Sequence, residues 1–586
     1  MYFEIIVVLI VLVFLVIGLY KEFFHPAALF LFGVTIFVVF GILTPKEALS
    51  GFSNEQIATI ILLLLVSNTI QKVGIINFYF SKFLKETLSY KSFLKRMFLS
   101  VSTLSAFLNN TPIVALLIPY VYEWSRKRHI SPSKLLIPLS FAAILGGTIT
   151  LIGTSTNLLI NGFLLENNLN PFELFDFAYV GIPATLIGFF YIYFLGNKLL
   201  PERKDILDSF LEKKKEYLVE TVIKKGSPLI GKNIKEANLR NLKGLFLVEV
   251  IRKGKKISPV SPSEILEEDD ILIFAGQTTS VVDLVSSFKG LSLPEACIVN
   301  EEKVDIVEVV ISNNSSLINK KVRDTDFRAK YDAAIIGVHR NGEKLKGKIG
   351  EIVLRPGDLL LLVTGKDFWK RVEDTTDFYI ISKVRELYNI DLKKGNLILA
   401  GFILIIILSA LKIVPLFVGL LTFISVLVIS KITTYAEIKK GIDVNLIIIA
   451  ALSIAIGKAI VSSGMADFLA LNLIKLFSPV GVIGALIGVY LLTNILTEFV
   501  TNVAAASIAF PVAISTANHL SLDYVPFVLA VAYGASASFL TPIGYQTNLM
   551  VYAVGNYRFK DFIIVGLPLS FIYGILCILI LKLLYL

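Results

Sequence analysis

The sequence predicts an α-helical polytopic membrane protein made of two inverted repeats, with a soluble α+β tandem-repeat module inserted between them. Three observations indicate this fold class. Of the 586 residues, 55% are hydrophobic and only 17% are charged, with a mean hydropathy of +0.74, whereas soluble domains carry about 25% charged residues. Apolar runs long enough to cross a bilayer recur along the chain. Both the apolar ends and the polar middle of the sequence repeat internally.

The hydrophobic pattern divides the chain into four parts. We expect a first membrane repeat at residues 1–198, two polar domains at 199–300 and 301–394, and a second membrane repeat at 395–586. No basic segment precedes the first apolar run and no small-residue cleavage site follows it. That run is therefore expected to be a retained span rather than a signal peptide.

Composition excludes several functional classes. The two cysteines, Cys297 and Cys577, lie far apart in the sequence, which argues against a disulfide scaffold or a thiolate zinc site. No nucleophile arrangement or phosphate-binding loop stands in a sensible context, so we do not expect an enzyme. The net charge of +10 is explained by Lys and Arg in cytoplasmic loops. The expected surroundings are a lipid bilayer, and no nucleic-acid partner is expected.

Each membrane repeat is expected to contain five spans and one re-entrant hairpin with a polar tip. The spans are long apolar runs, and each hairpin is a long apolar segment interrupted by polar residues. In the first repeat the spans lie at about 2–20, 26–43, 57–73, 134–165 and 177–198, an amphipathic stretch at 77–95, and the hairpin at 96–124, interrupted at Asn109-Asn110-Thr111-Pro112. In the second repeat the spans lie at about 395–411, 415–431, 444–462, 524–554 and 561–585, and the hairpin at 480–517, interrupted at Thr501-Asn502.

The two repeats align with a nearly constant offset. Asn109 and Thr501, at the two hairpin tips, stand 392 residues apart. Gly153 and Gly544, which begin two further polar interruptions, stand 391 apart. An internal repeat that is broken at corresponding places indicates the binding site of a secondary transporter.

The charge distribution predicts the topology. Five spans per repeat is an odd number, so the repeats must be inverted in the membrane. With the central module in the cytoplasm, the inside segments 71–96 and 124–134 are rich in Lys and Arg, whereas the outside segment 166–176 has three acids and no Lys or Arg. This agrees with the positive-inside rule. We therefore expect a multi-pass protein of the cell membrane with a cytoplasmic central module and both termini outside.

The candidate chemistry lies in four interrupted segments, the two hairpin tips and the loops at 152–157 and 541–548. Unwound backbone at bilayer depth is tolerated only where it is buried in protein or lines a cavity. Freed carbonyls and Ser, Thr and Asn oxygens are hard ligands that suit Na⁺, and helix N-termini attract anions. Because the segments contain no Lys or Arg, an anion there must be neutralised by helix dipoles and bound Na⁺, which predicts obligatory symport. The alternative is that these small polar residues only pack helices together.

These motifs resemble those of the divalent anion:sodium symporter family, which comprises the sodium–sulfate and sodium–dicarboxylate carriers. The resemblance covers both membrane halves and rests on four strings in the family's order: NNTP, GGTITLIGTSTNLLING, TEFVTN and TPIGYQTNLMVY. It implies a homodimer with an elevator-type transport domain, Na⁺ as the coupling ion and a small dianion as the substrate.

The resemblance also implies the site residues. The substrate would be bound by residues of all four segments: Asn110, Thr111, Thr154, Ser155, Asn502, Val503, Tyr545, Gln546 and Thr547. The sodium ligands would be Asn109, Gly153 and Asn157 at the first site and Thr501, Gly544 and Asn548 at the second.

Departures from the family's pattern bear on the substrate. Asn109 and Thr501 stand where the family has Ser, and Val503 where it has Thr; the dicarboxylate carriers usually have Pro where this chain has Tyr545 and Gln546. A bulkier second loop with fewer hydroxyls favours a smaller anion, so sulfate is the first expectation. A dicarboxylate carrier, or an arsenite or proton-coupled relative, is the alternative. A K⁺ channel is disfavoured because no TVGYG filter sequence occurs.

Two charged residues lie inside apolar spans. Lys458 is either a functional group, as intramembrane ionisable residues usually are, or a cation that snorkels or pairs with an acid such as Glu498. Glu498 precedes the second tip and is expected to stabilise it rather than to bind substrate.

The central module repeats with an offset of 88 residues, which relates Ser227 to Ser315 and Asp270 to Asp358. Each copy alternates short β-like runs with turns. Each resembles the C-terminal domain of regulators of K⁺ conductance, the TrkA-C type, and sodium–sulfate carriers with such an inserted pair form a branch of the family. The module is expected either to bind a ligand or to serve as a dimerising scaffold.

Overall fold

The protein is described here from a computed structural model. It describes residues 2–21, 24–85, 89–203, 218–239, 245–253, 255–257, 260–276, 291–292, 306–312, 315–340, 343–345, 349–365, 367–372, 375, 377–381 and 392–586. Cys297 and the expected boundary at 300/301 lie outside the described residues.

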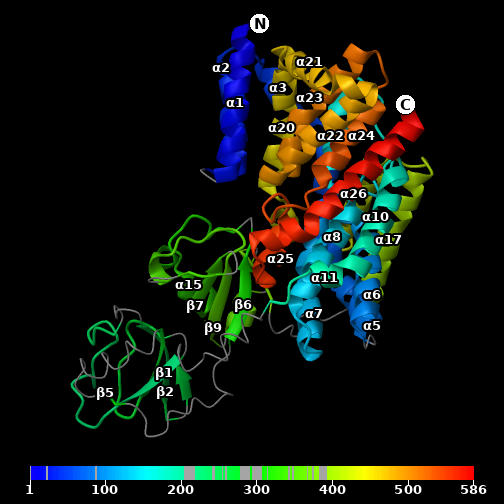
Figure 1. Ribbon diagram of the computed structural model, residues 1–586. Helices are drawn as coiled ribbons and strands as arrows, with labels where there is room; N and C mark the ends of the chain where they lie inside the picture. The colour runs from blue at the N-terminus through cyan, green and yellow to red at the C-terminus, as the bar shows by residue number, and fades with distance from the viewer. Residues whose placement is uncertain are drawn as a thin grey trace.

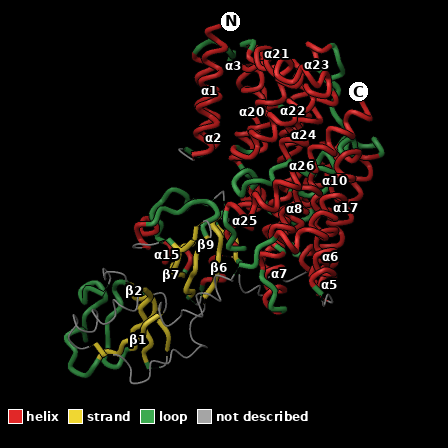
Figure 2. The backbone as a smooth tube through the Cα atoms, in the orientation of Figure 1, coloured by secondary structure: helices red, strands yellow, loops and turns green. Residues whose placement is uncertain are grey.

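A large helical region and two smaller β-sheets make up the molecule (Figures 1 and 2). Both termini lie toward the end of the helical region that is remote from the sheets (Figure 1). Among the described residues, eight helical segments are long and apolar enough to cross a membrane. The expectation of a mostly helical, polytopic membrane protein is confirmed.

Several helices of the N-terminal half begin at a capping side chain. They are α1 (Tyr2–Lys21), α2 (Pro26–Val39), α3 (Pro45–Leu49), α4 (Glu55–Lys72), α5 (Ile75–Lys85), α6 (Tyr90–Ser105), α7 (Asn110–Lys127), α8 (Leu136–Gly147), α9 (Ser155–Glu166), α10 (Ala178–Tyr191) and α11 (Asn197–Leu199). The amphipathic stretch expected at 77–95 is shared by α5 and the first turns of α6. The two helices are separate because the Ser89 side chain accepts a hydrogen bond from the Ser92 N–H and so starts a new helix.

The helices of the C-terminal half follow in the same order. They are α17 (Leu392–Ala410), α18 (Leu416–Ile429), α19 (Tyr435–Gly441), α20 (Val444–Ser462), α21 (Met465–Phe477), α22 (Gly481–Phe499), α23 (Asn502–Leu520), α24 (Val525–Ser536), α25 (Gln546–Val554) and α26 (Phe559–Tyr585). The capping box of Thr44 and Glu47 at α3 has a counterpart in Thr434 and Glu437 at α19. Packing corresponds as well, since α2 packs on α20 and α18 packs on α4.

Four helix pairs are interrupted at polar segments. The breaks separate α6 from α7, α8 from α9, α22 from α23, and α24 from α25. Three of the helices that follow a break start at a capping side chain: Asn109 accepts from the Thr111 N–H, Thr154 from the Thr156 N–H, and Thr501 from the Ala504 N–H. A capping side chain satisfies a backbone donor that would otherwise be left unpaired at a helix start.

The central residues form two antiparallel five-stranded sheets. The strands are β1 (Leu218–Ile223), β2 (Leu245–Arg252), β3 (Lys255–Ile257), β4 (Ile271–Gly276) and β5 (Leu291–Ser292), then β6 (Ile306–Ile311), β7 (Ala333–Arg340), β8 (Glu343–Lys344), β9 (Leu359–Thr364) and β10 (Phe378–Ile380). The orders are β3-β2-β4-β1-β5 and β10-β6-β9-β7-β8. Strands 88 residues apart thus occupy the same place in each sheet, and the register shift between β2 and β4 has a counterpart between β7 and β9.

An Arg–Asp ion pair with a buried carboxylate occupies the corresponding place in each sheet unit. Arg252 donates two hydrogen bonds to Asp270, at 2.9 and 2.8 Å. Arg340 donates two to Asp358, both at 2.7 Å. Both carboxylates are fully buried, and removing either Arg would leave an uncompensated buried charge.

The second sheet contacts the helical region directly. The Glu308 carboxylate on β6 is buried and accepts a hydrogen bond of 3.0 Å from the hydroxyl of Tyr122 on α7. The turn before β9 packs against Leu549 of α25, because a Cβ at Gly357 would lie 2.9 Å from the Leu549 Cγ. Along β9, Leu360 and Leu362 face the core of the sheet unit itself, whereas the alternating residues Leu359, Leu361 and Val363 belong to the apolar cluster of the membrane helices.

A buried carboxylate gives the second sheet unit a pH-dependent stability. Asp377 accepts hydrogen bonds from Lys330 (2.8 Å), the Tyr331 hydroxyl and the Ser316 N–H. Burial acts to raise the pKa of Asp377, but these hydrogen bonds outweigh it and lower the pKa from its usual 3.8 to about 2. A carboxyl with a depressed pKa stabilises the fold fully above its unfolded pKa, and this stabilisation is lost as the pH falls toward the folded pKa.

We expect Asp377→Asn to destabilise this unit by about 1–3 kcal/mol at pH 7, the usual scale for lost charged hydrogen bonds. The difference in unfolding free energy between this variant and the native protein should become smaller as the pH falls below about 4. The measurement is denaturant unfolding of the full chain followed by Trp369 fluorescence, in a Trp124→Phe background that removes the only other tryptophan. Asp324→Asn, at an exposed pair with Arg323, is the matched control and should have little effect. A difference in unfolding free energy that stays constant down to pH 3 would contradict the depressed pKa of Asp377.

Candidate functional site

The first hairpin tip meets the second interrupted loop. Asn110 Nδ2 donates a hydrogen bond of 2.6 Å to the Tyr545 hydroxyl, and the Thr111 hydroxyl donates one of 3.0 Å to Gln546 Oε1. The side chain of Thr154, at the start of α9, lies close to the Tyr545 hydroxyl. Residues more than 430 positions apart are therefore brought together at Tyr545.

The second tip closes on the same loop. The amide nitrogen of Asn502 faces the carbonyl oxygens of Gly544 and Ala535, each at 3.2 Å. The N-termini of α7 and α25 thus meet at Tyr545, the start of α9 lies beside the Tyr545 hydroxyl, and the N-terminus of α23 faces the carbonyl of the preceding residue, Gly544. Each helix N-terminus carries about half a positive charge, so this place favours an anion.

Each hairpin holds the amide at its tip with a hydroxyl from its first helix. The Ser105 hydroxyl donates to Asn110 Oδ1, whereas the Thr497 hydroxyl lies 2.9 Å from the Asn502 amide nitrogen. Ser105 and Asn110 each precede their counterparts, Thr497 and Asn502, by 392 positions. The two tips therefore use corresponding residues, with the amides facing their hydroxyls in opposite orientations.

Glycine allows each loop to approach its hairpin. A Cβ at Gly153 would lie 2.8 Å from the carbonyl oxygen of Ser105, and a Cβ at Gly544 would lie 2.6 Å from that of Thr497. Only a residue without a side chain fits this close backbone approach. Each expected sodium site is consequently a place where loop and hairpin backbones, with their carbonyl oxygens, come together.

Two asparagines hold the loops. Asn157 Nδ2 donates to the Thr150 carbonyl at 3.0 Å. Asn548 Nδ2 donates to the carbonyls of Ser538 at 2.8 Å and Thr541 at 3.3 Å. These amide nitrogens satisfy backbone groups that have no helical partner, as a membrane interior requires.

Glu498 binds the second loop rather than the tip. Its buried carboxylate accepts hydrogen bonds from the N–H groups of Phe539 and Leu540, both at 3.0 Å, and of Thr541 at 2.9 Å. The expected stabilising role is therefore directed at residues 539–541. An acid inside an apolar span was the signal that singled it out.

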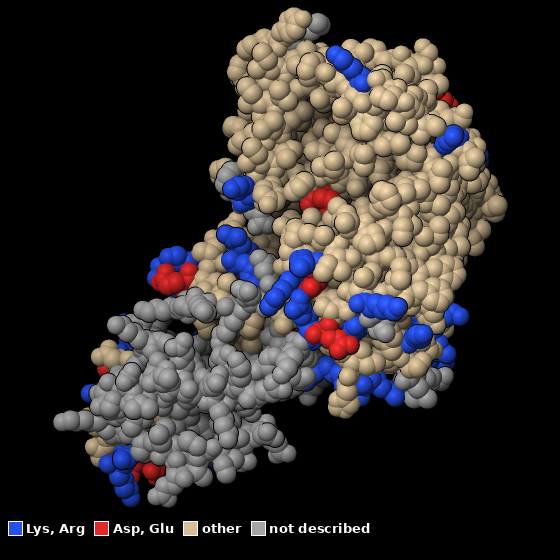
Figure 3. Space-filling view, in the orientation of Figure 1, with Lys and Arg blue, Asp and Glu red and all other residues tan. Residues whose placement is uncertain are grey.

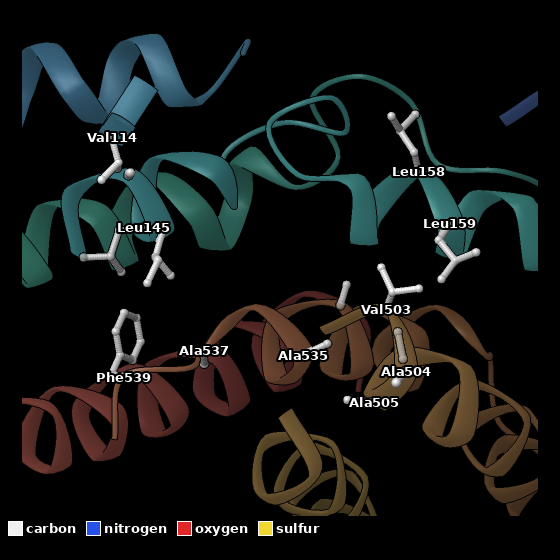
Figure 4. Packing of buried hydrophobic residues seen from close by; sticks show 14 of the residues in the cluster. Val114, Leu145, Leu158, Leu159, Val503, Ala504, Ala505, Ala535, Ala537 and Phe539 are labelled. Atoms are coloured by element: carbon white, nitrogen blue, oxygen red, sulfur yellow. The ribbon is translucent and has the colours of Figure 1, made fainter. Parts of the chain in front are cut away.

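The expected site residues differ in exposure. Asn110, Gly153, Thr154, Asn157, Val503, Gly544, Thr547 and Asn548 are buried; Asn109, Thr111, Ser155, Asn502 and Tyr545 are half-buried; Thr501 and Gln546 are exposed. Val503 is only 6% exposed and belongs to the apolar cluster that also contains Leu158 and Leu159 (Figure 4). Its side chain packs the two halves together.

Lys458 lies outside this arrangement. Its Nζ lies 2.7 Å from Glu166 Oε2, so its partner is Glu166 rather than Glu498. The pair joins α20 to the end of α9. Among the described residues, no group of three or more His, Cys, Asp or Glu side chains could hold a metal ion.

Comparison with known proteins identifies the family. A model described as "Citrate transporter" matches residues 7–521 and, in a second match, 402–586. The chain belongs to the citrate transporter family. Sodium–sulfate carriers, which the sequence motifs resemble, also occur among its relatives. Sodium/sulfate cotransporter 1 of Chlamydomonas reinhardtii is 24% identical, over 90% of this chain and 83% of its own length.

Two more similar proteins cover nearly the whole chain. A protein of Chlamydomonas reinhardtii named as a sulfur deprivation response regulator is 31% identical, over 93% of this chain and 95% of its own length. An uncharacterized transporter of Synechocystis sp. is 33% identical, over 94% of this chain and 92% of its own length. The family and the transporter names confirm the expectation of a transporter, and none of these names describes an enzyme.

We expect Asn110→Ala and Asn502→Ala each to lower substrate uptake at least tenfold, because each removes two or more hydrogen bonds worth about 1–3 kcal/mol apiece. Uptake is measured in proteoliposomes, and monodispersity of each purified variant shows that it is folded. The matched control is Asn472→Ala, whose amide bonds only to Phe468 of its own helix. Near-normal uptake by either tip variant would assign that residue to packing.

Proposed function

We propose that this transporter is a sodium-coupled symporter of a small divalent anion, with sulfate as its first substrate and an elevator-type mechanism. One observation carries the proposal: the N-termini of α7 and α25 meet at Tyr545 and that of α23 faces the adjacent Gly544, among oxygen ligands, and the four interrupted segments contain no basic side chain. Helix dipoles alone supply only partial charges. A dianion therefore needs Na⁺ bound beside it, which makes symport obligatory.

The two sodium sites are proposed where each glycine loop meets its hairpin. Asn109 and Thr501 supply side-chain oxygens, and Gly153 and Gly544 allow backbone carbonyls to approach. Asn157 and Asn548 hold the loops through their amide nitrogens, which leaves carbonyl oxygens to complete each site. Such an all-oxygen set fits a hard cation and offers no soft ligand.

Sulfate is favoured by the bulk of the second loop. Tyr545 and Gln546 add bulk to this loop and bond to the first tip, and Val503, packed in the apolar cluster, supplies no hydroxyl. A compact tetrahedral anion is served by converging dipoles, whereas a second carboxylate there would lose hydration without an equivalent partner. Sulfate is also what the cotransporter relatives are named for.

A dicarboxylate or citrate carrier is the second candidate. Gln546 uses its Oε1 to accept from Thr111, which directs its amide nitrogen elsewhere as a donor for another carboxylate. The description of the family model names citrate.

We further propose that the two membrane halves are inverted repeats and that the two sheets are TrkA-C-like domains in the cytoplasm. Matching caps 390 residues apart and matching strands 88 residues apart support this. Lys and Arg gather at the end of the helical region beside the sheets, whereas most of its visible surface lacks charge (Figure 3), as the positive-inside rule requires. The termini then lie outside, and the homodimer implied by the motifs is part of the proposal.

The test is uptake of labelled sulfate by proteoliposomes. We expect uptake with an inward Na⁺ gradient and its loss when choline replaces Na⁺. Uptake that persists in choline and follows a proton gradient would refute sodium coupling. Unlabelled succinate and citrate should compete less well than sulfate, and competition at equal or lower concentration would favour the dicarboxylate candidate.

A further inference from the structure

Ser140 connects α8 to the start of α25. Every residue of α8 is buried, and Ser140 is fully so. Its Oγ lies 2.8 Å from the Thr547 hydroxyl oxygen and 2.7 Å from Asn548 Oδ1. A buried hydroxyl costs free energy unless it is hydrogen-bonded, so this side chain is held in place by these two contacts.

The donors and acceptors in this contact can be assigned from chemistry. An amide oxygen only accepts, whereas a hydroxyl both donates one proton and accepts. Ser140 therefore donates to Asn548 Oδ1, and the Thr547 hydroxyl can donate in turn to Ser140. This fixes which end of the Asn548 amide faces α8.

The orientation of Asn548 determines what it does for the loop. With its oxygen bound to Ser140, its nitrogen faces the carbonyls of Ser538 and Thr541 and donates to both. A rotated amide would place an oxygen against two carbonyl oxygens, which is repulsive. Ser140 thus acts on residues 538–541 through Asn548, and these residues lead directly to Gly544.

The contact has no counterpart in the other repeat. Pro138 in α8 and Pro526 in α24 stand 388 residues apart, and the same offset places Val528 opposite Ser140. Valine has no hydroxyl, so the first loop cannot be oriented through Asn157 in this way. The role of Ser140 belongs to the second sodium site alone.

We propose that Ser140 is a positioning residue for the second sodium site: it orients Asn548, and through it the loop that approaches Thr497, without touching Na⁺ or the anion. This rests on the proposed sodium coupling and adds a residue that no sequence motif contains. Its loss weakens Na⁺ binding more than anion binding, because Thr547 is one expected anion ligand among nine, whereas the loop that Asn548 holds belongs to the sodium site.

The experiment compares Ser140→Ala with the native protein in proteoliposomes. We expect the Na⁺ concentration for half-maximal sulfate uptake to rise roughly tenfold, the effect of one lost buried hydrogen bond. The KM for sulfate at saturating Na⁺ should change less than twofold. Na⁺-dependent thermal stabilisation of the purified protein, with choline as the reference, should show the same shift in Na⁺ dependence.

Two further variants keep the result interpretable. Ser140→Cys keeps a side chain in the space of the hydroxyl but donates only weakly, so it should raise the Na⁺ requirement as Ser140→Ala does. If Ser140→Cys instead needed no more Na⁺ than the native protein, the effect of Ser140→Ala would be due to a cavity, and the proposal would be overturned. Ser453→Ala removes a fully buried hydroxyl that bonds only to Ile449 of its own helix, and it should leave the Na⁺ requirement unchanged.

An unchanged Na⁺ requirement in Ser140→Ala, or equal shifts in Ser140→Ala and Ser453→Ala, would also overturn the proposal. A parallel loss of sulfate affinity would do so as well, because it would show a general structural role. If the native protein itself shows no response to Na⁺, the proposed symport fails, and that result is distinct from any difference between variants.

Discussion

Backbone that leaves a helix inside a membrane must find its hydrogen-bond partners within the protein. The whole candidate site depends on this constraint. At the second loop, Glu498 accepts from three consecutive N–H groups, while Asn548 donates to two carbonyls. Because these groups are satisfied, the chain can stay unwound beside a hairpin tip, and helices can begin inside the bundle.

The sequence predicted those features that depend on neighbouring residues. The helix starts after Asn109, Thr154 and Thr501 follow from capping side chains, and the close approaches at Gly153 and Gly544 follow from the lack of a side chain. Span limits were predicted to within a few residues because the apolar runs that define them are also local in the sequence. The first arm of the first hairpin, expected from residue 96, begins earlier, at Tyr90, because Ser89 caps α6.

Contacts between distant residues could not be predicted in this way. Nothing near Ser140 in the sequence indicates Asn548, and nothing near Lys458 indicates Glu166. The packing of Val503 against the other half was missed because motif alignment gives a position along the chain but not the direction of a side chain. Such pairings are set by the packing of the two halves, which one sequence does not display.

The two halves share a plan but hold their loops differently. The second loop is fixed by Glu498 and by Ser140 through Asn548, whereas the corresponding positions in the other half are Ala106 and Val528. The shared contacts are those of Thr150 to the Ala106 carbonyl and of Thr541 to the Glu498 carbonyl. The second loop therefore has two side-chain supports that the first loop lacks at the corresponding positions.

The docking of the second sheet also affects how the chain can be divided. Glu308 is buried against Tyr122, and the turn at Gly357 covers Leu549. Cutting the sheet away would uncover an apolar patch on α7 and α25 at the membrane surface, and contiguous patches of this kind promote aggregation. A truncated protein that precipitates would therefore report the loss of a covering surface, whereas polar replacements at that surface would be needed before its transport activity could be interpreted.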